Sequence, residues 1–111
     1  HAAALFDQTG ELLLVREDIG RHNAFDKVIG GAIRSEIPNK ILGLSGRIGW
    51  ELVAKAVRSN VEIIVAVGAI SSAAETLARS SGVTLVGFAS SKTPAVVGQL
   101  NRIIDKPSVN R

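Results

Sequence analysis

The chain has 111 residues, of which 13 are Lys or Arg, 10 are Asp or Glu, and none is Cys or Met. This length predicts one domain with a single core. The absence of Cys excludes a disulfide framework, a thiolate zinc site and a cysteine nucleophile within this sequence. Because a translated chain starts with Met, a sequence that starts with His1 is expected to be a fragment or a processed product.

Charge and hydropathy exclude two further classes. The formal net charge is +3, and only 4% of the residues are aromatic. Since the basic residues are scattered singly, neither a nucleic-acid-binding tail nor an aromatic platform for single strands is expected, although the charge permits an anionic ligand. No apolar stretch reaches the roughly 18 residues that a membrane-spanning helix needs, so no membrane partner is expected.

The first 15 residues predict a β-hairpin. Residues 2–6 and 11–15 are mainly apolar, and Asp7, Thr9 and Gly10 between them are typical of a turn. The unbroken apolar run that ends the hairpin predicts a strand covered on both faces.

Helical periodicity follows over residues 21–35. The apolar positions with helical spacing are Phe25, Val28, Ile29, Ala32 and Ile33. Gly30 and Gly31 weaken this helix by about 1 kcal/mol each relative to alanine. Close packing of the helix on a sheet would explain that cost.

Strands and helices alternate over the rest of the chain. Strands are predicted at 41–44, 62–67 and 84–88, and helices at 47–59, 73–81 and 96–104. The apolar stripe predicted for the helix over 47–59 consists of Trp50, Val53, Ala54 and Val57.

Local signals refine two of these helices. Glu51 and Lys55 are spaced for an i,i+4 ion pair. Ser72 and Glu75 match the capping box S-x-x-E, and Gly82 lies where a helix-ending glycine is common.

This order of elements predicts an α/β fold with three layers, α/β/α. Strands that alternate with helices imply a mostly parallel sheet with helices on both faces, and the antiparallel hairpin makes that sheet mixed. Ligands of open α/β sheets bind outside the carboxyl ends of the parallel strands. Four polar or Gly-rich segments follow strands here, and three of them lead into helix N-termini, where free N–H groups favour anions.

The first of these segments carries the densest set of polar groups. It contains Asp18, Gly20, Arg21, His22 and Asn23. We interpret it as a clamp for a phosphate or a polar ring, in which Arg21 and His22 donate hydrogen bonds and Asp18 accepts one. The alternative is that Asp18 or Asn23 only caps the helix and that the arginines are solvated.

The other three segments are shorter. The second is Ser45, Gly46 and Arg47, in which Arg47 can hold an anion bidentately. The third offers Ser71 as a hydroxyl for a ligand while Ser72 caps the helix. The fourth is a loop suited to a phosphate, formed by Phe88, Ser90, Ser91, Lys92 and Thr93. Each alone is most simply a cap or a solvated loop, so the interpretation rests on their convergence.

Two enzyme classes are excluded. Ser45, His22 and Asp18 could form a Ser-His-Asp triad, but the nucleophile elbow G-x-S-x-G is absent. A zinc deaminase would share the predicted order of elements, but it needs H-x-E and P-C-x-x-C at two helix starts. The chain has His22-Asn23-Ala24 and Ser45-Gly46-Arg47 at those places, so the metal ligands are missing. The G-x-G-x-x-G and Walker A fingerprints are also absent.

One long motif carries a family resemblance. The run REDIGRHNAFDKV over residues 16–28 closely resembles the R-E-D-x-G-R-H-N-A-x-D-K-V signature of the formate dehydrogenase accessory protein family (FdhD/NarQ). The further matches are His1-Ala2-Ala3, Ser45-Gly46-Arg47, Glu51 with Lys55-Ala56, Ala69 with Ser71-Ser72, Leu77-Ala78, and Thr84-Leu85 with Gly87-Phe88. The resemblance corresponds to the C-terminal half of a family member.

The resemblance implies a role in sulfur transfer to the molybdenum cofactor before that cofactor enters formate dehydrogenase. In the family a C-x-x-C cysteine carries the persulfide received from a cysteine desulfurase. The second half binds molybdopterin guanine dinucleotide, for which GDP is a surrogate, and the four segments would supply the cofactor-binding residues. The resemblance also implies a cytidine-deaminase-like fold without the zinc site, a homodimer and a cytoplasmic location.

The sequence departs from the family in ways that leave a second function open. The sulfur-carrying Cys is absent, so the chain alone is not expected to form the persulfide. Ile70 stands where the family usually has Pro, and Ser90, Ala95 and Val97 stand where it usually has Arg, Asn and Tyr. Lys92 can replace that Arg in part, as a point charge. The alternative function is an interaction domain that dimerises and binds no nucleotide.

Overall fold

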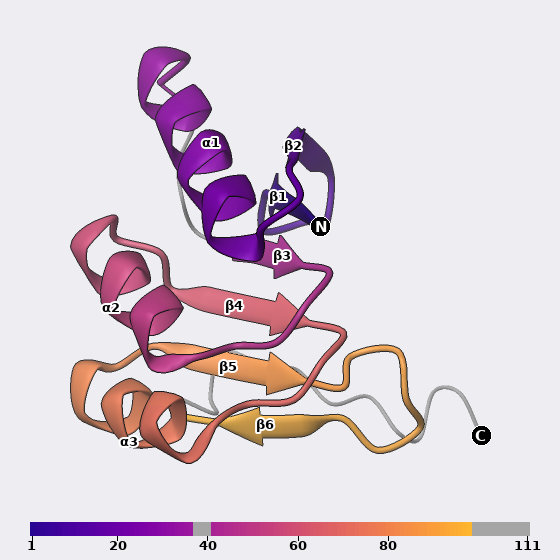
Figure 1. Ribbon diagram of the computed structural model, residues 1–111, viewed down its shortest axis with the longest axis vertical. Helices are drawn as coiled ribbons and strands as arrows, with labels where there is room; N and C mark the ends of the chain where they lie inside the picture. The colour runs from indigo at the N-terminus through magenta and orange to yellow at the C-terminus, as the bar shows by residue number, and fades with distance from the viewer. Residues whose placement is uncertain (37–40, 99–111) are drawn as a thin grey trace.

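The structure is a computed structural model that describes residues 1–36 and 41–98. The described residues form three helices and six strands, arranged as in Figure 1. In chain order they are β1 (Ala2–Phe6), β2 (Leu12–Glu17), α1 (Arg21–Arg34), β3 (Ile41–Leu44), α2 (Trp50–Arg58), β4 (Ile63–Ala66), α3 (Ser72–Ser81), β5 (Thr84–Gly87) and β6 (Ala95–Val97). The strands make one sheet in the order β2-β1-β3-β4-β5-β6.

The sheet is mixed, as the sequence predicts, but it is parallel only at its centre. β3 pairs with β4 and β4 with β5 in parallel, whereas the remaining pairs are antiparallel. β1 and β2 form the predicted hairpin. Asp7 closes its turn, because one carboxylate oxygen accepts from the backbone N–H groups of Thr9 at 2.8 Å and Glu11 at 3.0 Å. Gly10 has a φ of 87°, which favours glycine at this position.

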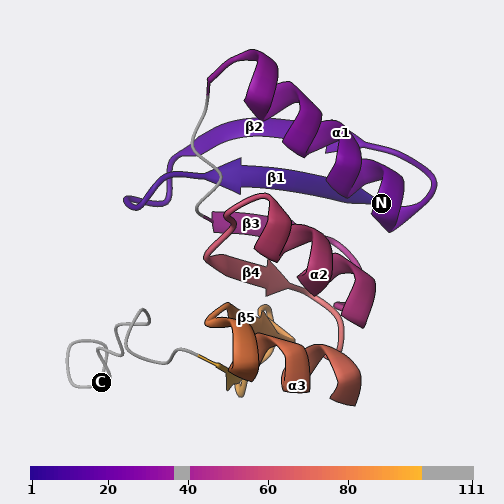
Figure 2. The same ribbon diagram turned by 90° about the vertical axis from the view of Figure 1, so that its left-hand side faces the viewer.

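The α/β class is confirmed, but the helices do not lie on both faces of the sheet. In Figure 2 α1, α2 and α3 all lie on the near side of the strands. The reason is the direction in which the chain crosses the sheet. β3, β4 and β5 follow one another in the same direction, so right-handed crossovers place both connecting helices on one face. Within the described residues the fold therefore has two layers, one of helices and one of strands, instead of the predicted three. Its order of elements is compatible with a cytidine-deaminase-like fold.

The core lies between the three helices and one face of the sheet. Burial alternates along β1, β3 and β4, as expected for strands with one covered face. β2 differs from its prediction, because Leu12 and Val15 are 54% and 46% exposed. As an edge strand it is packed by α1, and Val15 and Glu17 are exposed among the described residues. The largest fully buried side chains include Phe25, Leu5, Leu42, Ile48, Leu52, Ile64 and Leu85.

Several helix details differ from prediction. α2 begins at Trp50 rather than at residue 47. Ser71, not Ser72, is the N-cap of α3, because its Oγ accepts from the backbone N–H of Ala74 at 3.1 Å. Gly82 ends α3 in a left-handed conformation, as predicted. Three residues that the sequence predicts on the apolar stripes of α1 and α2 are exposed in the structure: Ile33, Trp50 and Val57.

The chain after β5 also differs from prediction. A helix is predicted over 96–104, but Ala95–Val97 form β6, which pairs antiparallel with β5. The β-branched Val96 and Val97 favour a strand where a neighbouring strand edge is free to pair. Residues 99–104 lie outside the described part of the chain. Among the helices of the described ranges, none has the length and apolar character needed to cross a membrane.

The paired glycines of α1 have different surroundings. A Cβ at Gly31 would lie 3.0 Å from Leu14 Cδ2 and 3.2 Å from Arg16 Nη2, whereas a Cβ at Gly30 would meet only Arg34 Nη1, at 3.4 Å. Close packing on β2 therefore explains Gly31 but not Gly30.

Gly30→Ala is expected to raise the free energy of unfolding by about 0.5–1 kcal/mol, because alanine has the higher helix propensity and its Cβ meets only a flexible side chain. Urea denaturation would measure the change. Gly31→Ala is the matched control, and it is expected to show no such gain because its Cβ meets β2. Equal stabilisation by both variants would contradict this explanation.

Candidate functional site

Four strands end at one edge of the sheet. β1 is antiparallel to both β2 and β3, so β2 and β3 point in the same direction. β4 and β5 run parallel to β3. The carboxyl ends of β2, β3, β4 and β5 therefore share one edge. The four segments identified in the sequence all leave the sheet from this edge.

Backbone hydrogen bonds hold three of these segments side by side. Gly68 N donates to Gly46 O at 3.1 Å, and Phe88 N donates to Gly68 O at 3.0 Å. Ile48 N donates to Ala69 O at 2.9 Å. Glycine permits this close approach, because a Cβ at Gly68 would lie only 2.9 Å from Gly46 O. The connections after β3, β4 and β5 are thus joined to one another by backbone hydrogen bonds.

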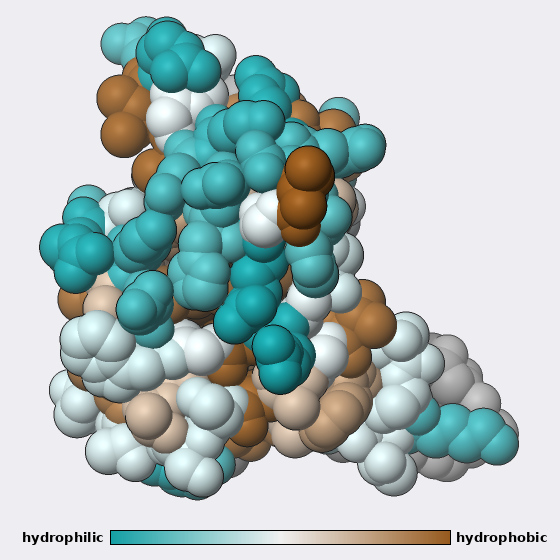
Figure 3. Space-filling model, viewed as in Figure 1, coloured by the Kyte–Doolittle hydropathy of each residue, from teal (hydrophilic) through white to brown (hydrophobic). Residues whose placement is uncertain are grey.

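A cleft of about 370 Å³ opens at this edge. The residues that line it are Arg21, Arg47, Ile48, Gly49, Ala69, Ile70 and Ser71. Arg21 is the first residue of α1, Gly49 is the N-cap of α2 and Ser71 is the N-cap of α3, so the N-termini of all three helices border the cleft. In Figure 3 hydrophilic residues gather over α1 and beside its first turn, in the upper and central part of the view.

Two arginines give the cleft its charge. Arg21 Nε is buried without a hydrogen-bond partner. Among the described residues neither Arg21 nor Arg47 forms an ion pair, and no acidic side chain lines the cleft. In the same ranges no three His, Asp or Glu side chains gather as metal ligands. Two guanidinium groups, a serine hydroxyl and helix N-termini form a donor set that suits an anion with several oxygens.

Asp18 holds the segment before α1 in place. Its carboxylate accepts from Lys27 Nζ at 2.8 Å and from Gly20 N at 3.2 Å. The hydrogen bond from Lys27 is the main cause that lowers the pKa of Asp18 from 3.8 to about 2, with smaller contributions from Gly20 and Asn23. Neither Asp18 nor Asn23 caps α1, because the N-cap is Gly20 and it makes no side-chain cap hydrogen bond. Asp18 thus fixes the position from which Arg21 enters the cleft.

Asp18 makes the stability of the fold depend on pH. Because the pKa of Asp18 is lower in the folded chain than its usual 3.8, the carboxylate stabilises the fold above pH 3.8, and this contribution is lost as the pH falls toward about 2. Asp18→Asn is expected to flatten the pH dependence of the thermal midpoint in this window. Lys27→Ala is expected to return the pKa of Asp18 toward 3.8 in an NMR titration of its carboxyl carbon. A pH profile that Asp18→Asn leaves unchanged would refute this assignment.

Side-chain pairs join α1 and α2 beside the cleft. His22 Nε2 lies 3.6 Å from Glu51 Oε2, and Lys55 Nζ donates to both Asp26 carboxylate oxygens at 3.0 Å. These pairs replace the predicted ion pair between Glu51 and Lys55, because each finds its partner on α1. His22 therefore links two helices and does not line the cleft.

The other predicted site residues lie outside the cleft lining. Ser45 Oγ accepts from Ala2 N at 2.8 Å and does not cap a helix. Gly46 lies against the stem of Arg21, because a Cβ there would be 3.3 Å from Arg21 Cδ. Ser72 is exposed. The loop after β5 is also exposed and does not line the cleft; its predicted residues are Phe88, Ser90, Ser91, Lys92 and Thr93.

The apolar part of the lining was not predicted from the sequence. Ile48 and Ile70 form an isolated parallel bridge, and with Gly49 and Ala69 they line the cleft. A bridge between two connections is set by tertiary pairing, so local periodicity carries no signal of it. The signal that could have found these residues was their place directly after two neighbouring parallel strands.

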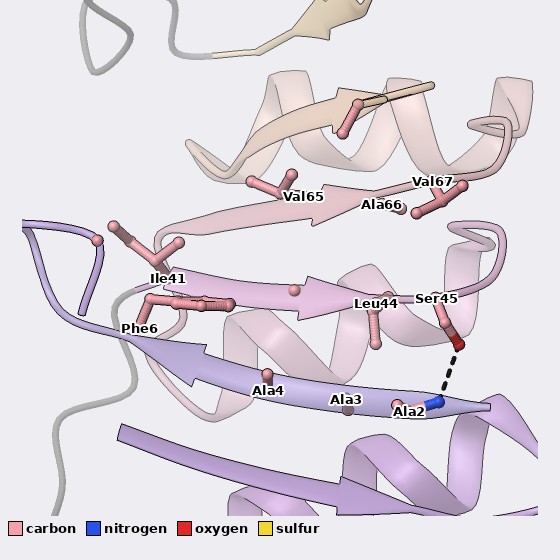
Figure 4. Close-up of a pocket in the computed structure, with 13 residues that line it drawn as sticks. Ala2, Ala3, Ala4, Phe6, Ile41, Leu44, Ser45, Val65, Ala66 and Val67 are labelled. Carbon is pink, nitrogen blue, oxygen red and sulfur yellow. Dashed lines mark hydrogen bonds between the residues drawn. The ribbon is translucent and has the colours of Figure 1, made fainter. Parts of the chain in front are cut away.

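A second hollow, of about 420 Å³, lies on the face of the sheet opposite α1, α2 and α3 (Figure 4). Its apolar lining includes Ala4, Phe6, Ile41 and Val65. Of the residues described as lining it, only Ser45 has a polar side chain, and that Oγ accepts from Ala2 N. This hollow suits apolar contacts and offers nothing to hold an anion.

Comparison with known proteins adds family evidence to this geometry. A model of the FdhD/NarQ family matches residues 1–104. The chain is 50% identical to a sulfur carrier protein FdhD from Nocardia farcinica, over 93% of this chain and 38% of that protein. It is 43% identical to a sulfur carrier protein FdhD from Streptomyces coelicolor, over 100% of this chain and 40% of that protein.

A solved structure shows the same fold. A crystal structure from Desulfotalea psychrophila, assigned as a formate dehydrogenase accessory protein, matches with a TM-score of 0.85 at 33% sequence identity. The match covers 93% of this chain and 47% of that chain. The chain therefore spans about two fifths of the length of these curated relatives and about half of the solved structure.

Proposed function

The chain belongs to the FdhD/NarQ family, and from that premise we propose that it is the cofactor-binding part of an accessory sulfurtransferase for formate dehydrogenase. Its ligand is molybdopterin guanine dinucleotide, which it holds while the cofactor receives sulfur. Relatives named sulfur carrier proteins support the sulfur-related role. The likeness to a formate dehydrogenase accessory protein supports formate dehydrogenase as the client enzyme.

The observation that carries this proposal is the pair of arginines without acidic partners in one cleft. Arg21 and Arg47 both line it, and Arg21 Nε is buried and unpartnered. A dinucleotide cofactor carries phosphate oxygens that accept hydrogen bonds from such groups. The cleft volume of about 370 Å³ is near the lower end of the roughly 300–1,000 Å³ of small-molecule sites. The cleft therefore fits a phosphate-bearing part of the cofactor rather than the whole molecule.

The proposal divides the work between this chain and the rest of the protein. The bound cofactor would supply the molybdenum chemistry, while Arg21, Arg47 and Ser71 would hold and orient it. We assign residues 1–111 to a single domain equivalent to the C-terminal half of a family member. The sequence has no Cys, so in this proposal the sulfur-carrying Cys would lie in a part of the protein outside residues 1–111. A cysteine desulfurase would act through that part, in the cytoplasm, and a second copy of the chain would complete a homodimer.

A second candidate function is an interaction domain that binds no nucleotide. Ser90, Ala95 and Val97 replace polar and aromatic residues that the family usually has, and the last two form part of β6. The apolar hollow in Figure 4 offers a contact face. This alternative predicts a dimer whose thermal midpoint does not move with GDP. Binding to the folded state would raise that midpoint.

Calorimetric titration with GDP tests the proposal. Saturable binding is expected, and Arg47→Ala is expected to weaken it by about tenfold or more, because a hydrogen bond to a charged group contributes about 1.5–3 kcal/mol. Arg58→Ala is the matched control, since Arg58 is the last residue of α2 and lies at the opposite end of that helix from the cleft. No saturable binding would refute the proposed function, whereas saturable binding with equal affinity of both variants would refute the assignment of the ligand to Arg47.

A further inference from the structure

The lining of the cleft indicates which part of a nucleotide it recognises. None of its described side chains is a carboxylate or an amide, the groups that accept from the N–H donors of a guanine ring. Two of its backbone acceptors are engaged, because Ile48 O accepts from Ser71 N and Ala69 O accepts from Ile48 N. The described lining therefore offers donors to an oxyanion and no carboxylate or amide side chain to a base.

The guanidinium of Arg21 is held at the wall of the cleft. Its Nε is buried without a partner, and the stem packs so closely on Gly46 that a Cβ there would lie 3.3 Å from Arg21 Cδ. A buried N–H without an acceptor is unfavourable. An oxyanion in the cleft would supply the acceptor, since the planar guanidinium presents its N–H groups as a fork that matches phosphate oxygens.

Two lysines near the cleft form ion pairs with carboxylates, whereas among the described residues the two arginines of the cleft do not. Lys27 Nζ lies 2.8 Å from Asp18 Oδ2, and Lys55 Nζ lies 3.0 Å from Asp26 Oδ1. Ser71 adds a further donor, because its Oγ accepts from Ala74 N and its O–H proton stays available. Two separated guanidinium groups and a hydroxyl offer more donors than the two oxygens of a carboxylate need, so a phosphoryl group is the better match.

We propose that the cleft is a phosphoryl subsite in which Arg21, Arg47 and Ser71 hold the diphosphate of the nucleotide and the base contributes little. The inference rests on the proposed cofactor-binding function for the identity of the ligand. It goes further by stating that selectivity for guanine, where the protein has any, comes from residues outside this cleft. Inorganic pyrophosphate and nucleoside diphosphates with another base are then also ligands of this site.

Competition calorimetry with pyrophosphate, GDP, ADP and guanosine tests this assignment. Pyrophosphate and ADP are expected to displace GDP, with ADP within about tenfold of GDP and guanosine weaker than GDP by about tenfold or more. Arg21→Lys keeps the positive charge but removes the Nε–H, so pyrophosphate binding should weaken by about tenfold. Arg47→Lys is a second variant, at an exposed residue, and Arg58→Lys is the matched control. Thermal melting would verify that each variant is folded.

The outcomes separate this inference from the proposed function. If GDP binds but guanosine binds as tightly, or ADP does not compete, the phosphoryl subsite is refuted while cofactor binding stands. If pyrophosphate binds but GDP does not, the phosphoryl subsite stands and the proposed function fails. If folded Arg21→Lys and Arg47→Lys both bind pyrophosphate as the Arg58→Lys control does, the assignment to these arginines is wrong.

Discussion

Phe25→Ala is expected to lower the free energy of unfolding by about 3–5 kcal/mol. Phe25 is 1% exposed and lies on α1, which packs on β1 and β2. Removing its ring takes a large apolar surface out of the core and leaves a cavity that a packed interior fills only in part. Since domains are stable by roughly 5–15 kcal/mol, this single change removes a large share of the stability that holds Arg21 at the cleft.

Urea denaturation of Phe25→Ala and Ile33→Ala measures this effect against a matched control. Ile33 lies on the same helix but is 69% exposed, so its replacement is expected to change the free energy of unfolding by no more than about 0.5 kcal/mol. Similar losses in the two variants would show that the core does not lie on the face of α1 described above.

Gly68→Ala is expected to disrupt the cleft and to cost about 1–3 kcal/mol of stability. The new Cβ would lie 2.9 Å from Gly46 O and 3.1 Å from Arg47 N. Both atoms belong to the backbone, so the two connections must separate to make room. That movement would strain the hydrogen bond from Gly68 N to Gly46 O and displace Arg47. GDP binding should therefore weaken together with stability.

The control for Gly68→Ala is Gly30→Ala, in which the same methyl group is added where it meets only Arg34 Nη1 at 3.4 Å. Thermal melting and GDP titration of both variants would separate the effect of the position from that of the substitution. Wild-type stability and GDP affinity in Gly68→Ala would show that the close contact between the two connections is not needed for the cleft.

The sequence predicts helices and strands well where the pattern that marks them lies within the segment itself. Apolar runs on either side of turn residues place the hairpin, helical spacing places α1, and Gly82 marks the end of α3. The start of α2 could not be predicted in this way, because Ile48 is apolar and fits a helical pattern but pairs with Ile70 across two connections. β6 was missed for a similar reason, since Val96 and Val97 become a strand only beside the free edge of β5.

The position of the helices depends on topology rather than on periodicity. Helical stripes show which residues of a helix are buried but not which face of the sheet the helix covers. That choice follows from the order of β3, β4 and β5 in the sheet, which no single segment contains.

The sequence predicts at which edge of the sheet the candidate site lies, but it does not predict which side chains line the cleft there. The rule that ligands bind at the carboxyl ends of parallel strands selects Arg21, Arg47 and Ser71, which do line one cleft. The same rule also selects Asp18 and His22, but their side chains are engaged by Lys27 and Glu51. Charge and position identify the candidates, whereas tertiary partners decide which of them face the cleft.

An NMR titration of the ¹⁵N-labelled chain with GDP tests the central claim most directly, because it locates the ligand residue by residue. We expect the shifted backbone amides to cluster at 20–23, 46–51 and 69–73, around the cleft of Arg21 and Arg47. Shifts confined to β1, β3 and β4 on the face shown in Figure 4, or no shifts at saturating GDP, would contradict it.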